Sequence, residues 1–162
     1  MFLISITITI RNLKILFSKT IVLLMGVLLL VVVVSCENQN PEKIFFGKDY
    51  CDHCHMTIAD HKFGGELVTI KGKVFKFDSL ECMKSYEHNH SELSPFKKYV
   101  VNSSLPGELL EAETAKYLIK PDLRSPMGGL GVLSISKDSI DKDLNYKTWN
   151  DIYSNIDTRV NK

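Results

Sequence analysis

The chain has 162 residues, of which 44% are hydrophobic and 24% charged, and its formal net charge is +1 at pH 7. This length is enough for one ordinary domain with an additional segment. The near-balance of acidic and basic residues excludes the strongly basic surface typical of nucleic-acid-binding proteins, so we expect no nucleic acid partner.

Residues 1–35 are predicted to be a signal peptide. They contain three basic residues, Arg11, Lys14 and Lys19, and no acidic residue, and they include an unbroken apolar run at 21–34. That run is shorter than the roughly 20 residues of a transmembrane helix. Its length and basic flank are typical of the hydrophobic part of a secretory signal. Without this segment the rest of the chain has a formal charge of about −2, because the three basic residues are lost and all 19 acidic ones remain.

A cysteine follows this run closely, in the string Val33-Val34-Ser35-Cys36. A cysteine after a small residue at this place resembles a bacterial lipoprotein cleavage site, which predicts cleavage before Cys36 and a lipid on its sulfur. The alternative is that Cys36 is incidental and residues 21–34 remain as an uncleaved anchor. In the first interpretation residues 36–48 are the lipidated cysteine and a polar tether, and residues 49–162 are a domain held at a membrane of the cell envelope.

The region from 66 to 88 is expected to form a ββα unit. Its two strands, the tight turn between them and the helix are expected at 66–70, 74–77, 71–73 and 80–86. Two short strands separated by a glycine-containing turn predict a β-hairpin. Asp78 and Ser79 are both good N-cap residues for the helix, and Glu81 falls in its first turn.

A second unit is less distinct in the sequence. Its strands are expected at 98–101 and 132–136, with a helix at 111–118 and a last segment through Trp149 and Ile152. Ala112, Ala115 and Leu118 share one face of that helix, and Pro121 ends it. We therefore expect an α+β fold, one compact domain with two ββα-like units and a small, mostly antiparallel sheet.

Residues 50–56 concentrate potential metal ligands, in the order Tyr-Cys-Asp-His-Cys-His-Met. The spacing of Cys51 and Cys54 lets both sulfurs meet at one ion across a tight turn, and Met56 shares a face with Cys54 in an extended segment. Thiolates and thioethers are soft donors, which select Cu(I) over harder cations. We expect a copper(I) site built around these three residues.

Three other interpretations of the same residues stay open. Cys51 and Cys54 would also make a structural disulfide, half of a structural zinc site with the nearby histidines, or a redox centre that cycles between dithiol and disulfide. Redox motifs of this spacing usually follow a buried strand and open a helix. No convincing strand precedes Cys51, which makes the redox interpretation the less favoured one.

Candidates outside this segment are fewer. Met127 stands between Pro126 and Gly128, outside any periodic apolar run, which suits a ligand as well as a side chain packed under a loop. Cys82 lies in the expected helix, where a lone cysteine is commonly a small buried hydrophobe, and is an additional candidate ligand. His61, His88 and His90 are expected to face solvent. The sequence has no nucleophile motif, phosphate-binding loop or metalloprotease pattern, so no enzymatic activity is expected.

Taken in chain order, these motifs resemble the NosL-like copper chaperone lipoproteins. The resemblance rests on Cys36, residues 51–58, Asp60, Gly72, Phe77-Asp78, Cys82-Met83, Ala112, Ala115, Tyr117 and residues 125–128. It implies an α+β fold with paired ββα units over residues 49–162. It also implies a membrane-tethered Cu(I) carrier that faces the periplasm. Because that family is associated with copper-centre assembly in nitrous oxide reductase, the implied partner is a copper acceptor, either that enzyme or its assembly machinery.

The resemblance also implies a ligand set. The sulfur ligands of the family correspond to Cys51, Cys54, Met56 and Met127 in this chain. One departure concerns His55, because the family often has glycine at that place. The histidine adds an imidazole as a further candidate ligand and raises the question of the backbone shape of the turn.

Overall fold

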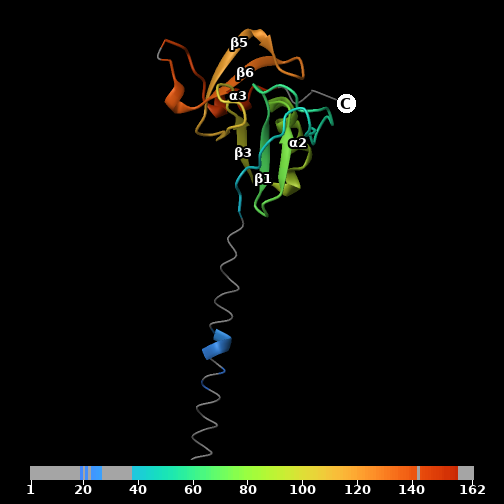
Figure 1. Cartoon of the computed structure of the whole chain (residues 1–162), viewed down its shortest axis with the longest axis vertical. Helices are drawn as coiled ribbons and strands as arrows, with labels where there is room; N and C mark the ends of the chain where they lie inside the picture. The colour runs from blue at the N-terminus through green and yellow to red at the C-terminus, as the bar shows by residue number, and fades with distance from the viewer. Residues whose placement is uncertain (1–18, 20, 22, 27–37, 142, 157–162) are drawn as a thin grey trace, which may run out of the picture. The chain divides into compact units, whose positions relative to one another are not determined.

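The computed structural model describes residues 19, 21, 23–26, 38–141 and 143–156 (Figure 1). The chain divides into two compact units, Met1–Cys36 and Glu37–Lys162. Cys36 and most of the expected signal peptide lie outside the described residues, so cleavage and lipidation there stay predictions. Among the described residues, no helix is both long and apolar enough to cross a membrane. The elements below belong to the second unit.

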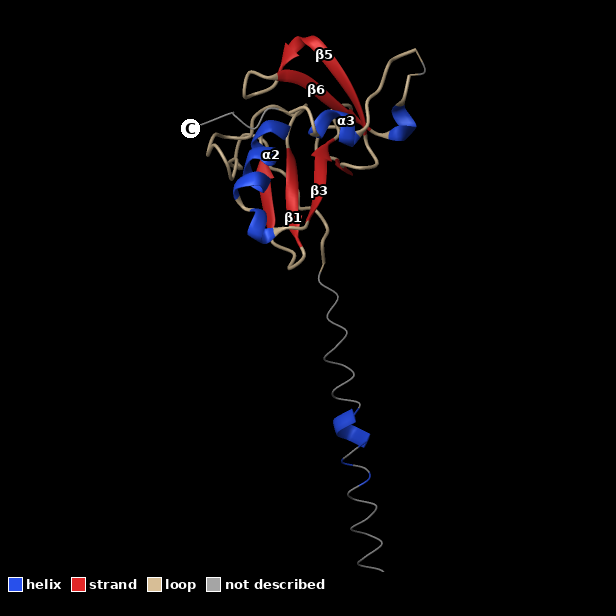
Figure 2. Cartoon of the chain, turned by 180° about the vertical axis from the view of Figure 1, so that it is seen from behind, coloured by secondary structure: helices blue, strands red, loops and turns tan. Residues whose placement is uncertain are grey.

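The first strands and the first helix of the second unit form the expected ββα motif (Figure 2). Its elements are β1 (Gly65–Thr69), β2 (Val74–Phe77), α2 (Leu80–Asn89) and the short 3₁₀ helix η1 (Ser91–Leu93). β1 and β2 pair antiparallel as a hairpin. The hydroxyl of Ser79 accepts a hydrogen bond from the backbone N–H of Cys82 at 3.2 Å, so Ser79 is the N-cap and Asp78 precedes it. The predicted hairpin and helix are confirmed.

A four-stranded antiparallel sheet forms the centre of this unit. It adds β3 (Phe96–Val101) and β4 (Leu109–Glu111), and its strand order is β2-β1-β3-β4. All five residues of β1 are buried, as suits a central strand. α2 packs against β1 and β2, and the ring of its Tyr86 lies 4.8 Å from that of Phe75 and 5.2 Å from that of Phe77. This aromatic packing holds the second half of α2 against β2.

A second sheet follows, with two strands and a short helix. Its elements are β5 (Lys116–Arg124), β6 (Leu130–Ile135), the 3₁₀ helix η2 (Lys137–Ser139) and α3 (Trp149–Tyr153). The strands pair antiparallel, and the rings of Trp149 and Tyr117 meet at 5.7 Å between α3 and β5. The expected α+β class with small antiparallel sheets is confirmed. The second ββα unit, however, is made of β5, β6 and α3, and the strand expected at 98–101 belongs to the first sheet as β3.

The helix predicted at 111–118 is wrong. Glu111 ends β4, where it pairs with Tyr99 of β3, and the backbone N–H of Ala112 donates to the carbonyl of Lys98 at 2.9 Å. Tyr117 is fully buried in β5, and its hydroxyl donates to the carbonyl of Ala112 at 2.7 Å. Pairing with distant strands therefore overrides the helix propensity of this stretch. Pro121, expected to end the helix, instead lies in β5.

Candidate metal centre

The cysteine-rich segment before β1 folds into a closed turn. Tyr50 and Thr57 form an antiparallel bridge. Inside it, the N–H of Cys51 donates to the carbonyl of Met56 at 2.8 Å, and the N–H of His55 donates to the carbonyl of Cys51 at 2.9 Å. These backbone bonds place Cys51 and Cys54 on one tight turn, as their spacing predicts.

This turn is attached to the edge of the main sheet. The N–H of Asp52 donates to the carbonyl of Lys76 at 2.8 Å, and the N–H of Lys76 donates to the carboxyl of Asp52 at 2.6 Å. The ammonium of Lys76 also pairs with Asp49 at 2.9 Å. Because β2 is an edge strand, its free backbone groups bind the cysteine turn and hold it beside the start of α2. The side chain of Asp52 is used for this attachment.

Four side chains from three elements converge at that place. They are Cys51 and Cys54 from the turn, Asp78 after β2, and Cys82 in the first turn of α2, and one potential ligand atom of each lies within 4.8 Å of the others. All three cysteines are free thiols. Cys51 and Cys82 are fully buried and Cys54 is half-buried. Three sulfurs and a carboxyl at this separation could hold a metal ion.

The thiols of this cluster have unequal acidities. A hydrogen bond from Cys82 lowers the pKa of Cys51 to about 7, and the same bond raises the pKa of Cys82 above its usual range. Burial raises the pKa of Cys54 to about 11. Metal binding displaces thiol protons, and the buried Cys51–Cys82 pair favours one thiolate near neutral pH, which is the form that binds a soft cation.

The two methionine candidates lie at the side of this cluster. Met56 is 47% exposed and lines a cavity of about 230 Å³ together with Asp78, Ser125 and Pro126. Met127 follows Pro126 in the loop between β5 and β6, is half-buried, and packs against the core cluster that includes Cys51 and Cys82. The fold therefore brings the Met127 loop and Met56 to the neighbourhood of Asp78, although they are far apart in sequence.

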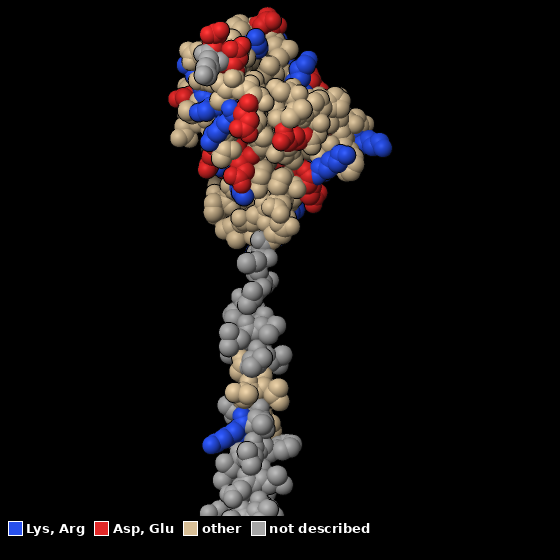
Figure 3. Space-filling model, turned by 60° about the vertical axis from the view of Figure 1, so that its left-hand side comes forward, with Lys and Arg blue, Asp and Glu red and all other residues tan. Residues whose placement is uncertain are grey.

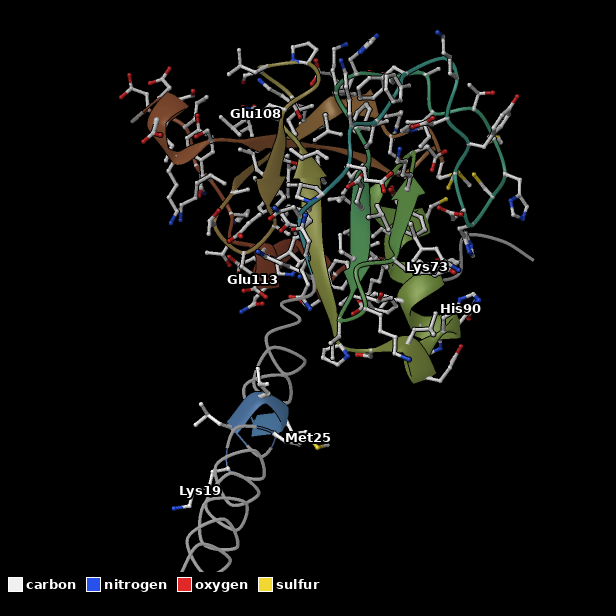
Figure 4. The ribbon with its side chains drawn as sticks, turned by 60° about the horizontal axis from the view of Figure 1, so that its bottom comes forward. Lys19, Met25, Lys73, His90, Glu108 and Glu113 are labelled. Atoms are coloured by element: carbon white, nitrogen blue, oxygen red, sulfur yellow. The ribbon has the colours of Figure 1, made fainter. Side chains whose placement is uncertain are left out.

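The histidines take no part in the four-residue cluster. His55 is exposed, and its backbone is left-handed with φ 61°, a conformation that favours glycine. The turn thus keeps the shape that glycine would give, with histidine in its place. His61 and His88 are exposed, as expected. His90 lies at the end of α2 (Figure 4). It is half-buried, and its ring stacks on that of Tyr86 with 4.0 Å between the centroids.

Charged side chains of both signs are mixed over the face of the second unit seen in Figure 3. Such a surface agrees with the near-zero net charge of the chain.

From the sequence alone, Cys82 is only an additional candidate ligand, and Asp78 is a candidate N-cap residue of the helix. Asp78 and Cys82 are four residues apart around the start of a helix, a spacing that brings side chains to one face. This spacing is the local signal for the pair, and both residues also belong to the motifs on which the family resemblance rests. The proximity of both residues to Cys51 depends on the attachment of the cysteine turn to β2, which no local pattern predicts.

Comparison with known proteins identifies the fold. No protein-family model and no curated protein matches the chain. A crystal structure of the copper chaperone NosL from Shewanella denitrificans matches with a TM-score of 0.54 and 20% sequence identity, covering 71% of this chain and 96% of that one. At this identity the likeness shows that the two proteins share a fold, which is the one that the sequence resemblance implied.

Proposed function

We propose that this chain is a Cu(I) carrier of the cell envelope, a NosL-like copper chaperone without enzymatic activity. The observation that carries the proposal is the convergence of three free thiols, Cys51, Cys54 and Cys82, with the carboxyl of Asp78 within 4.8 Å. Soft sulfur donors in this number suit Cu(I). The fold that the chain shares with a copper chaperone is a second line of support, separate from the geometry of the site.

Zinc is the nearest competitor, because three thiolates and a carboxylate also make a tetrahedral zinc site. The thioether of Met56, half-exposed in the cavity that Asp78 also lines, favours copper, since thioethers are ligands for Cu(I). The redox alternative has less support. Cys51 and Cys54 lie in a turn and no helix begins there, so the segment lacks the helix N-terminus that activates thiols in such motifs.

The difference in burial between the thiols suggests how the ion is transferred. Cys51 and Cys82 are fully buried, whereas Cys54 is half-buried and Met56 is half-exposed. An incoming soft ligand of a partner would reach the ion from the exposed side and replace Cys54 first. The buried pair would release the ion last, so copper passes through an intermediate with ligands from both proteins.

The location is proposed from the signal-like segment before Cys36, and the partner from the resemblance to the NosL-like family. We propose lipidation at Cys36 and a tether at 36–48, which hold the carrier at a membrane facing the periplasm. The proposed acceptor is nitrous oxide reductase or its assembly machinery. Lipidation is checked by labelling with a radioactive or clickable fatty acid in cells, with Cys36→Ala as the control that should take up no label.

The test of the carrier function is an anaerobic competition titration of the reduced full chain in mild detergent with Cu(I) and Zn(II). Tight Cu(I) binding that is lost in Cys51→Ala and weakened in Met56→Ala, together with weaker Zn(II) binding, is the expected result. Equal Cu(I) affinity in all three proteins, or a preference for Zn(II), would contradict the proposal. Chelation separates the structural zinc alternative, because it should unfold a zinc-stabilised domain and leave an empty carrier folded.

A further inference from the structure

Besides Asp78, a further carboxyl is buried next to the clustered cysteines. It lies in the first turn of α2 and binds the loop between β5 and β6. Glu81 is 8% exposed, and its Oε1 accepts a hydrogen bond from the hydroxyl of Ser125 at 2.7 Å. Glu81 directly precedes Cys82 in the helix, and Ser125 directly follows β5. This bond therefore joins the helix that carries a clustered thiol to the loop between β5 and β6.

Ser125 also organises the loop itself. Its hydroxyl accepts from the N–H of Gly129 at 3.0 Å, and its N–H donates to the carbonyl of Gly129 at 3.1 Å. The N–H of Gly128 donates to the carbonyl of Ser125 at 2.8 Å. These bonds close residues 125–129 into a tight turn with Met127 at its centre.

Because Gly129 has no side chain, the carboxyl of Glu81 occupies the space next to its Cα. A Cβ atom at position 129 would stand 2.2 Å from Oε1 of Glu81 and 3.3 Å from its Cδ. A side chain there would displace the carboxyl and break its bond to Ser125. The glycine is therefore needed for the close approach of the turn to α2.

We propose that Glu81 is a positioning residue for copper binding, which holds the turn that carries Met127 against the helix that carries Cys82. This inference rests on the proposed function. Metal ligands are oriented by neighbours that do not touch the ion, and losing such a neighbour typically costs about 10- to 100-fold in metal affinity. The need is strong for a ligand on the loop between β5 and β6, because the clustered candidate ligands lie on the cysteine turn, at the end of β2 and on α2, outside the two-stranded sheet.

The test is a set of variants in the full chain, measured by anaerobic Cu(I) competition with a chromophoric chelator. Glu81→Ala should weaken Cu(I) binding about 10- to 100-fold. Glu81→Gln keeps an acceptor oxygen for Ser125 and should bind nearly as the wild type. Gly129→Ala should resemble Glu81→Ala, although it changes no charge. Glu87→Ala, which removes a carboxyl of the same helix bound to Lys98 and Tyr153, is the matched control and should keep full affinity.

A double-mutant cycle with Met127→Ala identifies the route of the effect. The double variant Glu81→Ala with Met127→Ala should bind no more weakly than Met127→Ala alone, and X-ray absorption should show the same loss of one sulfur neighbour in both single variants. Additive losses, or a Glu81→Gln variant as weak as Glu81→Ala, would overturn the positioning role. Thermal unfolding of each metal-free variant shows whether it is folded.

The outcomes also separate this inference from the proposed function. A wild-type chain that binds no Cu(I) would overturn both. Tight Cu(I) binding in the wild type that Met127→Ala leaves unchanged would overturn the positioning role and leave the carrier function intact.

Discussion

The thiol of Cys54 donates to the carboxyl of Asp78, with 3.6 Å between Sγ and Oδ2. The other carboxyl oxygen of Asp78 is buried and has no hydrogen-bond partner among the described residues. A buried acceptor without a partner is costly for a fold. Beside three thiols, it is also a group that a bound cation would satisfy.

Asp78→Asn is expected to lower the affinity for Cu(I) about tenfold, because it removes a negative charge next to the cation and keeps the shape of the side chain. The measurement is chelator competition at fixed pH and salt. Asp60→Asn is the matched control, since Asp60 lines the neighbouring cavity but is not one of the four clustered groups. Equal losses of affinity in both variants would mean that the total negative charge around the cavity matters, and that Asp78 has no specific role in holding the ion.

Cys82→Ala should reduce Cu(I) affinity as strongly as Cys51→Ala. The cluster brings the two sulfurs together, and the variant also removes the hydrogen bond that lowers the pKa of Cys51. Met83→Leu is the control, because it changes a buried neighbour in the same helix at nearly constant volume and should cost less than about 1.5 kcal/mol of stability. If Cys82→Ala binds copper as tightly as the wild type, Cys82 is not a ligand and only packs in the core.

The parts of the fold that were predictable have strong local signals. The hairpin of β1 and β2 follows from two short strand-forming segments separated by a turn that contains Gly72, and α2 begins directly after Ser79, a good N-cap residue. The cysteine turn follows from the spacing of Cys51 and Cys54. For these segments, local propensity and the final structure agree.

The remaining parts depend on contacts between distant residues. The stretch 111–118 has helical composition, yet Glu111 pairs with Tyr99 and the strand after it pairs with β6. Likewise, a cysteine in a helix gives no sign of whether it faces the core or a metal. That Cys82 meets Cys51 is decided by hydrogen bonds between Asp52 and Lys76, which are 24 residues apart.

His55→Gly should stabilise the protein by about 0.5 to 1 kcal/mol. The left-handed backbone at φ 61° costs a non-glycine residue about 1–2 kcal/mol, and the greater freedom of unfolded glycine offsets part of the gain. Urea denaturation measures the change. His53→Gly is the control and should lose stability, because its backbone has no such strain. Cu(I) affinity should be unchanged in His55→Gly, and a tenfold loss would instead identify the imidazole as a ligand.

Glu66 predicts a pH dependence of stability that is independent of the metal centre. It is fully buried in β1, its Oε2 accepts from the N–H of Glu42 at 2.9 Å, and its Oε1 has no partner among the described residues. Burial raises the pKa of Glu66 from 4.5 to about 7, although the nearby Lys76 opposes the shift. The folded state therefore holds the proton more tightly than the unfolded state does.

The sign follows from this difference. Protonation of Glu66 stabilises the fold fully below about pH 4.5, and this contribution is lost as the pH rises through about 7. The loss is on the order of 3 kcal/mol. Glu66→Gln imitates the protonated carboxyl, so its stability relative to the wild type should increase between pH 5 and 8, as measured by urea denaturation across that range. Thr69→Ser, a change in the same strand that does not titrate, should give a curve parallel to the wild type's. A parallel curve for Glu66→Gln as well would show that Glu66 titrates normally in the folded protein.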